Sequence, residues 1–133
     1  MMKSTAEAYS VSGKESRRMS KPFEDYYIKL AGERAAVSWL EDKGFAIVKW
    51  ETRSPGAADI EAKSGKHLLV QVRTSVTPED PSSLTDGEEE ELITRAAKIE
   101  AEAWEARVQL DSNLQLLGKI KWRKLFPPEA SQA

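Results

Sequence analysis

Four polar side chains in this sequence have the types and spacing that metal-assisted hydrolysis requires. Glu33 interrupts the apolar stripe of a predicted helix, Asp59 follows a turn, and Gln71 and Arg73 lie on one face of an apolar strand. A buried amide or guanidinium is costly without a partner. Divalent cations such as Mg²⁺ take oxygen ligands, usually one or two carboxylates together with water. These residues therefore predict a metal site, in which Arg73 would hold an attacking water or offset charge on a phosphate.

Hydrophobic periodicity predicts the elements that must position these side chains. Residues 23–43 carry an apolar residue every three or four positions, which indicates a helix that stops at Gly44. Glu33 lies on its apolar face, where it either sits at the edge of the stripe and reaches water or points into a site. Residues 45–51, 57–62 and 67–73 are rich in β-branched and apolar residues, and we expect three strands there.

The loop at residues 64–66 sets the register between the second and third of these strands. A three-residue loop pairs Lys63 with His67, and Asp59 then falls opposite Gln71. Directly opposed residues share a face of the sheet with their Cβ atoms roughly 5 Å apart. We therefore expect Asp59 and Gln71 to be neighbours, with Arg73 one pleat further along.

The predicted helix directs Glu33 toward the same side of the sheet. The metal ligands we expect are Asp59, the carboxamide oxygen of Gln71 and the backbone carbonyl of Val72, while Glu33 would bind a metal-linked water. Plainer interpretations remain open: Asp59 is a loop or capping residue, and Gln71 and Arg73 face solvent or pair with an acid.

The rest of the chain predicts a second helix and a closing hairpin. Residues 74–86 contain two prolines and read as a loop, and residues 87–107 are full of helix formers with acids at the N-terminal end. Residues 108–111 and 114–125 are expected to form a β-hairpin. The predicted order is therefore helix, three strands, helix, two strands, an α/β (α+β) arrangement.

Composition bounds the class of protein. The chain has 133 residues, 40% hydrophobic and 32% charged, which indicates one globular domain. We place it at residues 23–126, between flexible tails at 1–22 and 127–133. The sequence has no cysteine, which excludes thiol catalysis and Cys-ligated zinc. No apolar run approaches the roughly 18 residues of a membrane span, and we expect a cytoplasmic protein with no membrane partner.

Charge is segregated along the chain. The formal net charge is −2, which by itself argues against a polyanion partner, and four acids form the block at residues 88–91. Bases gather near the C-terminus, where a local basic face remains open. The candidate nucleic-acid-binding residues are Arg53, Lys119, Lys121 and Arg123.

Taken together, the motifs resemble the PD-(D/E)xK, or restriction-endonuclease-like, superfamily, and within it the small Holliday-junction-resolvase-like nucleases. The residues that carry the resemblance, which extends over residues 26–125, are GERAA (32–36), KGF (43–45), SPGAAD (54–59) and LLVQVR (68–73). By position, Glu33 resembles the family's helix-one acid and Asp59 its metal-binding acid. Gln71 stands in place of the second acid and Arg73 in place of the lysine.

The resemblance implies a central mixed five-stranded β-sheet flanked by helices. It also implies a nuclease that hydrolyses DNA phosphodiester bonds with Mg²⁺ or Mn²⁺, acts on branched or structured DNA, and forms a homodimer. Two alternatives stay open: a catalytically impaired member that serves as a nucleic-acid-binding or protein-interaction subunit, and a fold relative without a nucleic-acid role.

Overall fold

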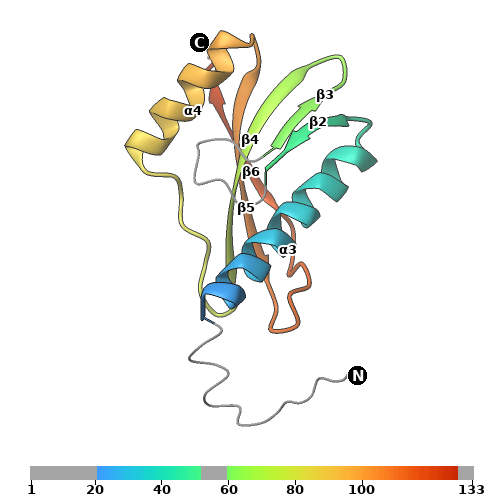
Figure 1. Cartoon of the computed structure of the whole chain (residues 1–133), viewed down its shortest axis with the longest axis vertical. Coiled ribbons are helices and arrows are strands. Elements are labelled where there is room, and N and C mark those ends of the chain that lie inside the picture. The colour runs from blue at the N-terminus through green and yellow to red at the C-terminus, as the bar shows by residue number, and fades with distance from the viewer. Residues whose placement is uncertain (1–20, 52–59, 129–133) are drawn as a thin grey trace.

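The computed structural model describes residues 21–51 and 60–128, whose elements follow the predicted order (Figure 1). In chain order the elements are α3 (Lys21–Asp42), β2 (Ala46–Trp50), β3 (Ile60–Lys63), β4 (His67–Val76), α4 (Asp86–Lys98), β5 (Glu102–Leu110) and β6 (Lys121–Phe126). Within these residues no helix is long and apolar enough to cross a membrane.

The strands form one mixed five-stranded sheet in the order β2-β3-β4-β5-β6. Strand β4 is therefore the central strand. Among the described pairs only β4 and β5 are parallel, and helix α4 forms the crossover between them. Together with the two described helices that flank the sheet, this confirms the predicted α+β fold class, and the architecture is consistent with a restriction-endonuclease-like fold.

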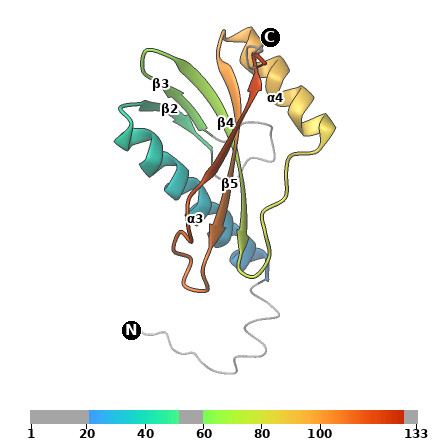
Figure 2. The same ribbon diagram turned by 180° about the vertical axis from the view of Figure 1, so that it is seen from behind.

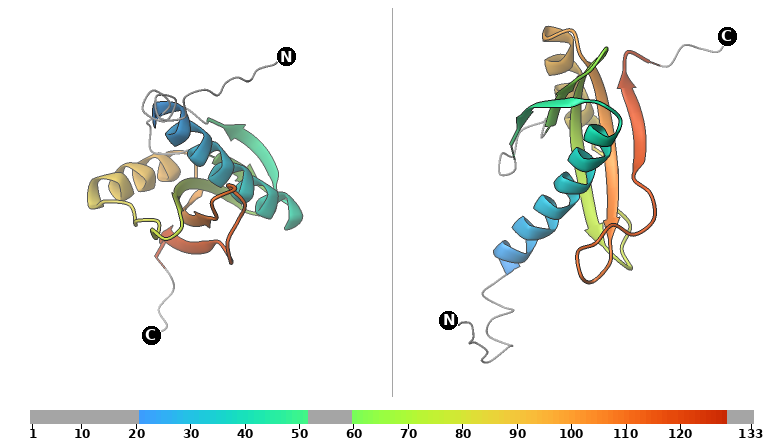
Figure 3. Two further views of the ribbon diagram at one scale, coloured as in Figure 1. Left: turned by 90° about the horizontal axis from the view of Figure 1, so that it is seen from below. Right: turned by 90° about the vertical axis from the view of Figure 1, so that its right-hand side faces the viewer.

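Each helix covers a different face of the sheet. The side chains of α3 pack with even-numbered residues of β4 and β5, including Val70, Val72 and Val108. The side chains of α4 pack with odd-numbered residues such as Leu69 and Ala103. In Figure 1 helix α3 lies in front of β5 and β6, and in Figure 2, seen from behind, it lies behind them. Figure 3 shows α3 running alongside the strands.

The predicted register of the β3–β4 hairpin is confirmed for the described residues. Lys63 pairs with His67, Glu61 with Leu69, and Ile60 with Val70. The register follows from the three-residue loop, because a slip by one residue would turn Ile60 and Ala62 away from the core.

The second helix is shorter than predicted, and this is the main correction to the secondary structure. Helix α4 ends at Lys98, and residues 102–107, expected to be helical, belong to strand β5. Just after the helix, the backbone of Glu100 adopts the left-handed conformation (φ 58°). The Ala101 amide then donates a hydrogen bond to the Ala96 carbonyl, which caps the C-terminal end of the helix. Because a glutamate rather than a glycine takes this position, the usual stop signal is missing from the sequence.

The strand that replaces the predicted helix alternates in burial. In EAWEARVQL, Ala103, Glu105, Arg107 and Gln109 face α4, whereas Trp104, Ala106, Val108 and Leu110 face α3. Ala and Glu favour helix locally, but pairing with β4 on one side and β6 on the other decides the conformation. Two boundaries also change: β4 continues through residues 74–76, which we expected in a loop, and β6 begins at Lys121 rather than at residue 114.

Candidate active site

Glu33 is fully buried, so the interpretation in which it reaches water is wrong. Nε1 of Trp50 donates a hydrogen bond of 2.9 Å to its Oε1 atom, and Nζ of Lys29, one turn earlier on α3, lies 3.4 Å from Oε2. A buried carboxylate needs such partners, because burial disfavours its charge. Helix α3 and the end of β2 therefore hold a fixed carboxylate beneath the surface.

Gly32 explains how this carboxylate comes close to β4. A Cβ atom at Gly32 would lie 1.9 Å from Oγ1 of Thr74, so only glycine allows α3 to cross β4 at this level. The strand residues immediately before Thr74 are Gln71, Val72 and Arg73. The helix-one acid is thus brought to the level of the QVR segment.

Gln71 and Arg73 approach from the face opposite to Glu33, which corrects the expectation that all four groups share one side of the sheet. Val70 and Val72 pack against α3, and the alternation of the strand turns Gln71 and Arg73 toward α4. Gln71 is buried, and Nη2 of Arg73 donates a hydrogen bond of 2.6 Å to Oε1 of Glu88 on α4.

A pocket connects the two faces at the edge of β4. Strand β3 pairs with β4 only as far as Val70 in the described part of the chain. Beside the second half of β4 lies a cavity of about 260 Å³. It is lined by Asp25, Ile28 and Lys29 from α3, by Val72, Arg73 and Thr74 from β4, and by Ser82 from the following loop. Arg73 and the lysine that pairs with Glu33 therefore border one space.

Two of the predicted site residues lie outside the described residues. These are Asp59 and Arg53, and the pairing of Asp59 with Gln71 stays a prediction, although the confirmed hairpin register leads to it. The described residues contain no group of three or more His, Cys, Asp or Glu side chains that could hold a metal ion. The metal site that we expect includes Asp59, so the site and the ligand role of Val72 both stay predictions.

Glu105 is the buried acid next to the candidate site that sequence reasoning missed, because we placed it on a helix. It is fully buried on β5, directly beside Gln71 in the sheet register. Its carboxylate accepts hydrogen bonds from the Leu84 amide (2.8 Å) and from Arg123 (3.1 and 3.2 Å). Burial alone would raise the pKa of Glu105, but these bonds and the charges of Arg123 and Arg107 outweigh it and hold the pKa below its ordinary value.

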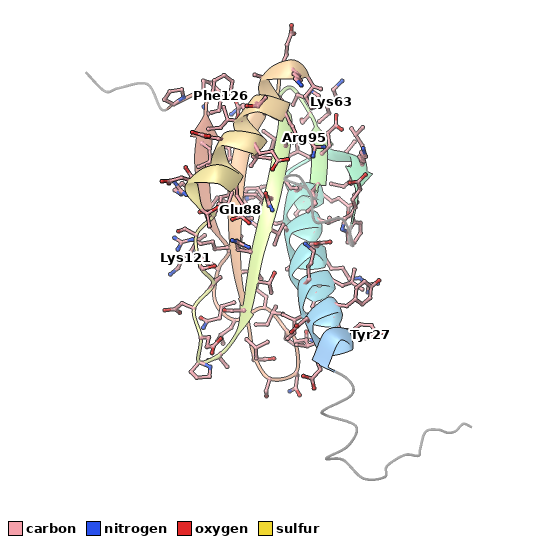
Figure 4. All side chains as sticks on the ribbon, turned by 60° about the vertical axis from the view of Figure 1, so that its left-hand side comes forward. Tyr27, Lys63, Glu88, Arg95, Lys121 and Phe126 are labelled. Atoms are coloured by element: carbon pink, nitrogen blue, oxygen red, sulfur yellow. The ribbon has the colours of Figure 1, made fainter. Side chains whose placement is uncertain are left out.

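Two of the four acids in the block at the start of α4 form ion pairs with arginines. Glu88 pairs with Arg73, and Glu89 accepts a hydrogen bond of 2.6 Å from Arg123. Arg123, one of the candidate nucleic-acid-binding residues, is therefore held between Glu89 and Glu105, and these carboxylates raise its pKa. Lys119 and Lys121 are exposed, and Figure 4 shows Lys121 at the side of the molecule.

Comparisons with known proteins bear on the fold. No family model and no curated protein matches the sequence. Among solved structures, the chain is similar to the 1.6 Å structure of Hjc from Archaeoglobus fulgidus, a Holliday junction resolvase from an archaeal hyperthermophile. The TM-score is 0.55 and the identity 24%, over 73% of this chain and 72% of that chain. At this identity the likeness shows that the two proteins share a fold.

Proposed function

We propose that this protein is a metal-dependent nuclease that hydrolyses DNA phosphodiester bonds, with branched or structured DNA as its substrate. The observation that carries the proposal is the fully buried carboxylate of Glu33, held by Trp50 and Lys29 where α3 crosses β4 beside the QVR segment. Branched DNA is favoured because the resolvase with the same fold is named for Holliday junctions.

The donor set fits Mg²⁺ or Mn²⁺. Asp59, the carboxamide oxygen of Gln71 and the carbonyl of Val72 would hold the cation, and all three are the hard oxygen donors that Mg²⁺ prefers. When bound, the cation polarises a phosphoryl oxygen and lowers the pKa of its water. Replacing a second acid by Gln71 removes one negative charge, which predicts weaker metal binding.

The protein's own residues supply orientation and charge. Arg73 borders the pocket, stays protonated, and suits phosphate binding, but it does not serve as a general base. Its hydrogen bond to Glu88 fixes the guanidinium, whose side chain is 29% exposed. Trp50 and Lys29 hold the buried Glu33 carboxylate in a fixed position, so its charge is already in place beside the QVR segment.

A second candidate function is a catalytically impaired member that binds nucleic acid or another protein. It is favoured by the 2.6 Å ion pair of Arg73 with Glu88, which competes with phosphate for the guanidinium, and by the neutral Gln71. In this case Gln71→Glu together with Arg73→Lys should raise cleavage above that of the wild type. The homodimer that the resemblance implies stays a prediction under either function.

The test is cleavage of a synthetic four-way DNA junction in Mg²⁺ and in Mn²⁺. Asp59→Ala should lower the cleavage rate at least about 100-fold, the scale of losing one electrostatic group of a catalytic site. Circular dichroism checks that the variant folds, and Glu90→Gln, an exposed acid on α4, should cleave like the wild type. Unchanged cleavage by Asp59→Ala would contradict the proposal.

A further inference from the structure

A row of three cations crosses the sheet on the face that α4 covers. Arg73 of β4 is the register partner of Arg107 on β5, and Arg107 is the partner of Lys121 on β6. Like charges at directly neighbouring positions destabilise a sheet. Arg73 pairs with Glu88 and Arg107 with Glu105, whereas Lys121 forms no ion pair within the described residues and can meet an anion from outside the chain.

A pocket of about 270 Å³ lies at that end of the row. Three of its lining side chains are the cations Arg107, Lys119 and Lys121, against one carboxylate, Asp80. The pocket is lined by the end of the β5–β6 loop, by both neighbouring strands and by the loop that precedes α4. It is thus a concave surface with an excess of positive charge, on a protein whose net charge is −2.

Two of the three cations of this pocket are not paired with a carboxylate in the described part of the chain. Lys119 and Lys121 form no ion pair there, whereas Nε of Arg107 forms an ion pair of 3.6 Å with Oε1 of Glu105. The Glu105 carboxylate also accepts hydrogen bonds from Arg123 and from the Leu84 amide. The exposed ammonium groups of Lys119 and Lys121 are therefore available to a ligand.

Backbone hydrogen bonds hold the walls of the pocket in place. The Leu117 amide donates a 2.8 Å bond to the Gln109 carbonyl, which ties the β5–β6 loop to β5 just before Lys119. On the other wall, Nε2 of Gln109 donates a 2.8 Å bond to the Glu79 carbonyl. Because both walls are anchored to β5, little ordering is left for a ligand to impose.

We propose that the pocket of Arg107, Lys119 and Lys121 binds a backbone phosphate of the DNA substrate, as a second anchoring point beside the candidate active site. The identity of the ligand as substrate rests on the proposed function. β6 lies two strands from β4, roughly 10 Å, so one DNA molecule reaches both Arg73 and this pocket. Arg123 is excluded from the anchor because two carboxylates hold it.

The experiment measures binding of a fluorescein-labelled four-way DNA junction by anisotropy, in chelator, over a series of salt concentrations. Lys119→Gln and Lys121→Gln should each weaken binding about fivefold to tenfold at 0.1 M salt and lower the slope of log K against log salt by about 1. Arg107→Gln should act in the same direction, and Arg107→Lys should restore most of the affinity.

The matched control is Lys63→Gln, which removes an exposed lysine that Figure 4 shows well away from Lys121. It should leave both affinity and slope unchanged. If the wild type binds the junction and both Lys119→Gln and Lys121→Gln show the same salt slope as the wild type, the proposal is overturned. Displacement of the junction by millimolar inorganic phosphate, or by an equal concentration of RNA of the same sequence, would overturn the assignment to DNA.

Failure of this pocket and failure of the proposed nuclease give different results. If the wild type binds but does not cleave the junction, and the lysine variants lose affinity, the anchor stands and the nuclease fails. If the wild type cleaves and the lysine variants keep the wild-type slope, the nuclease stands and the anchor fails.

Discussion

At the scale of single residues, Glu105 gives a physical reason for the amide at position 71. The two residues are neighbours in the parallel register of β4 and β5 and face the same side. A carboxylate at 71 would place a second negative charge beside the buried one, which raises the cost of ionising either group. An amide avoids that repulsion and keeps an oxygen for a cation.

Glu105 should also make stability depend on pH. Its folded pKa is lowered, so its contribution to folding is present above its unfolded pKa, about 4.3, and is lost as pH falls through the folded pKa. Glu105→Gln should lower the free energy of unfolding at pH 7 by roughly 2–3 kcal/mol, as expected for hydrogen bonds to a charged group. Urea unfolding from pH 7 down to pH 3 measures the difference.

That difference should shrink toward acid pH, because the wild-type carboxylate then also becomes neutral. The control is Glu90→Gln, whose carboxylate is exposed and should contribute little. If Glu105→Gln lowered the free energy of unfolding by the same amount at every pH, the charge of Glu105 would not be the cause. The loss would then come from the packing of the side chain alone.

At the scale of elements, the crossing of α3 over β4 decides where the candidate site lies. Helix α3 contributes both Glu33 and Lys29, and its distance from β4 is set by Gly32 against Thr74. The side chains of Ala36, Val37 and Leu40 continue the same contact into the core. The packing of one helix turn therefore positions the carboxylate relative to the QVR segment.

Gly32→Ala should be destabilising although alanine is the better helix former. Its Cβ would lie 1.9 Å from Oγ1 of Thr74, so the helix or the strand must shift, at a cost of about 1–3 kcal/mol. Gly87→Ala is the matched control, because no atom lies within 4 Å of its added Cβ, and we expect it to stabilise α4 by about 0.5–1 kcal/mol.

Thermal unfolding of both variants measures the contrast, and Gly32→Ala combined with Thr74→Ala should recover part of the loss. If Gly32→Ala were as stable as Gly87→Ala, the close approach of α3 to β4 would not be a constraint on the fold.

At the scale of the whole molecule, the sheet has a helix on each face. The candidate site lies between the two helices, beside the second half of β4. Groups from α3 and β4 border one pocket there, while Glu88 of α4 holds Arg73 from the other face. A cation bound to Asp59, Gln71 and Val72 would link β4 to the residue that precedes β3 in the chain. Binding to the folded state alone should then raise stability.

Mg²⁺ at ten times its dissociation constant should stabilise the protein by about 1.4 kcal/mol, which is a rise in Tm of roughly 4–8 °C for a chain of this size. Calorimetry with and without chelator measures the rise, independently of cleavage. Asp59→Ala should abolish it, and Glu90→Gln should retain it. An equal rise in Asp59→Ala would mean that Mg²⁺ binds elsewhere.

The sequence by itself determined the features that depend on neighbours along the chain. The helix through Glu33, the loop at 64–66 with the register of β3 and β4, and the order of the elements follow from periodicity and turn chemistry. These patterns involve contacts within a few residues, and they were enough to predict the fold class and to single out the QVR segment.

Only the tertiary structure decided which groups meet. It made residues 102–107 a strand against their helix propensity, turned Gln71 and Arg73 toward α4, and paired Arg73 with Glu88. It also buried Glu105 between Leu84 and Arg123, which lie about 20 residues away on either side. The physical reason is that ladder pairing and charge compensation involve residues far apart in the chain, and no local pattern encodes them.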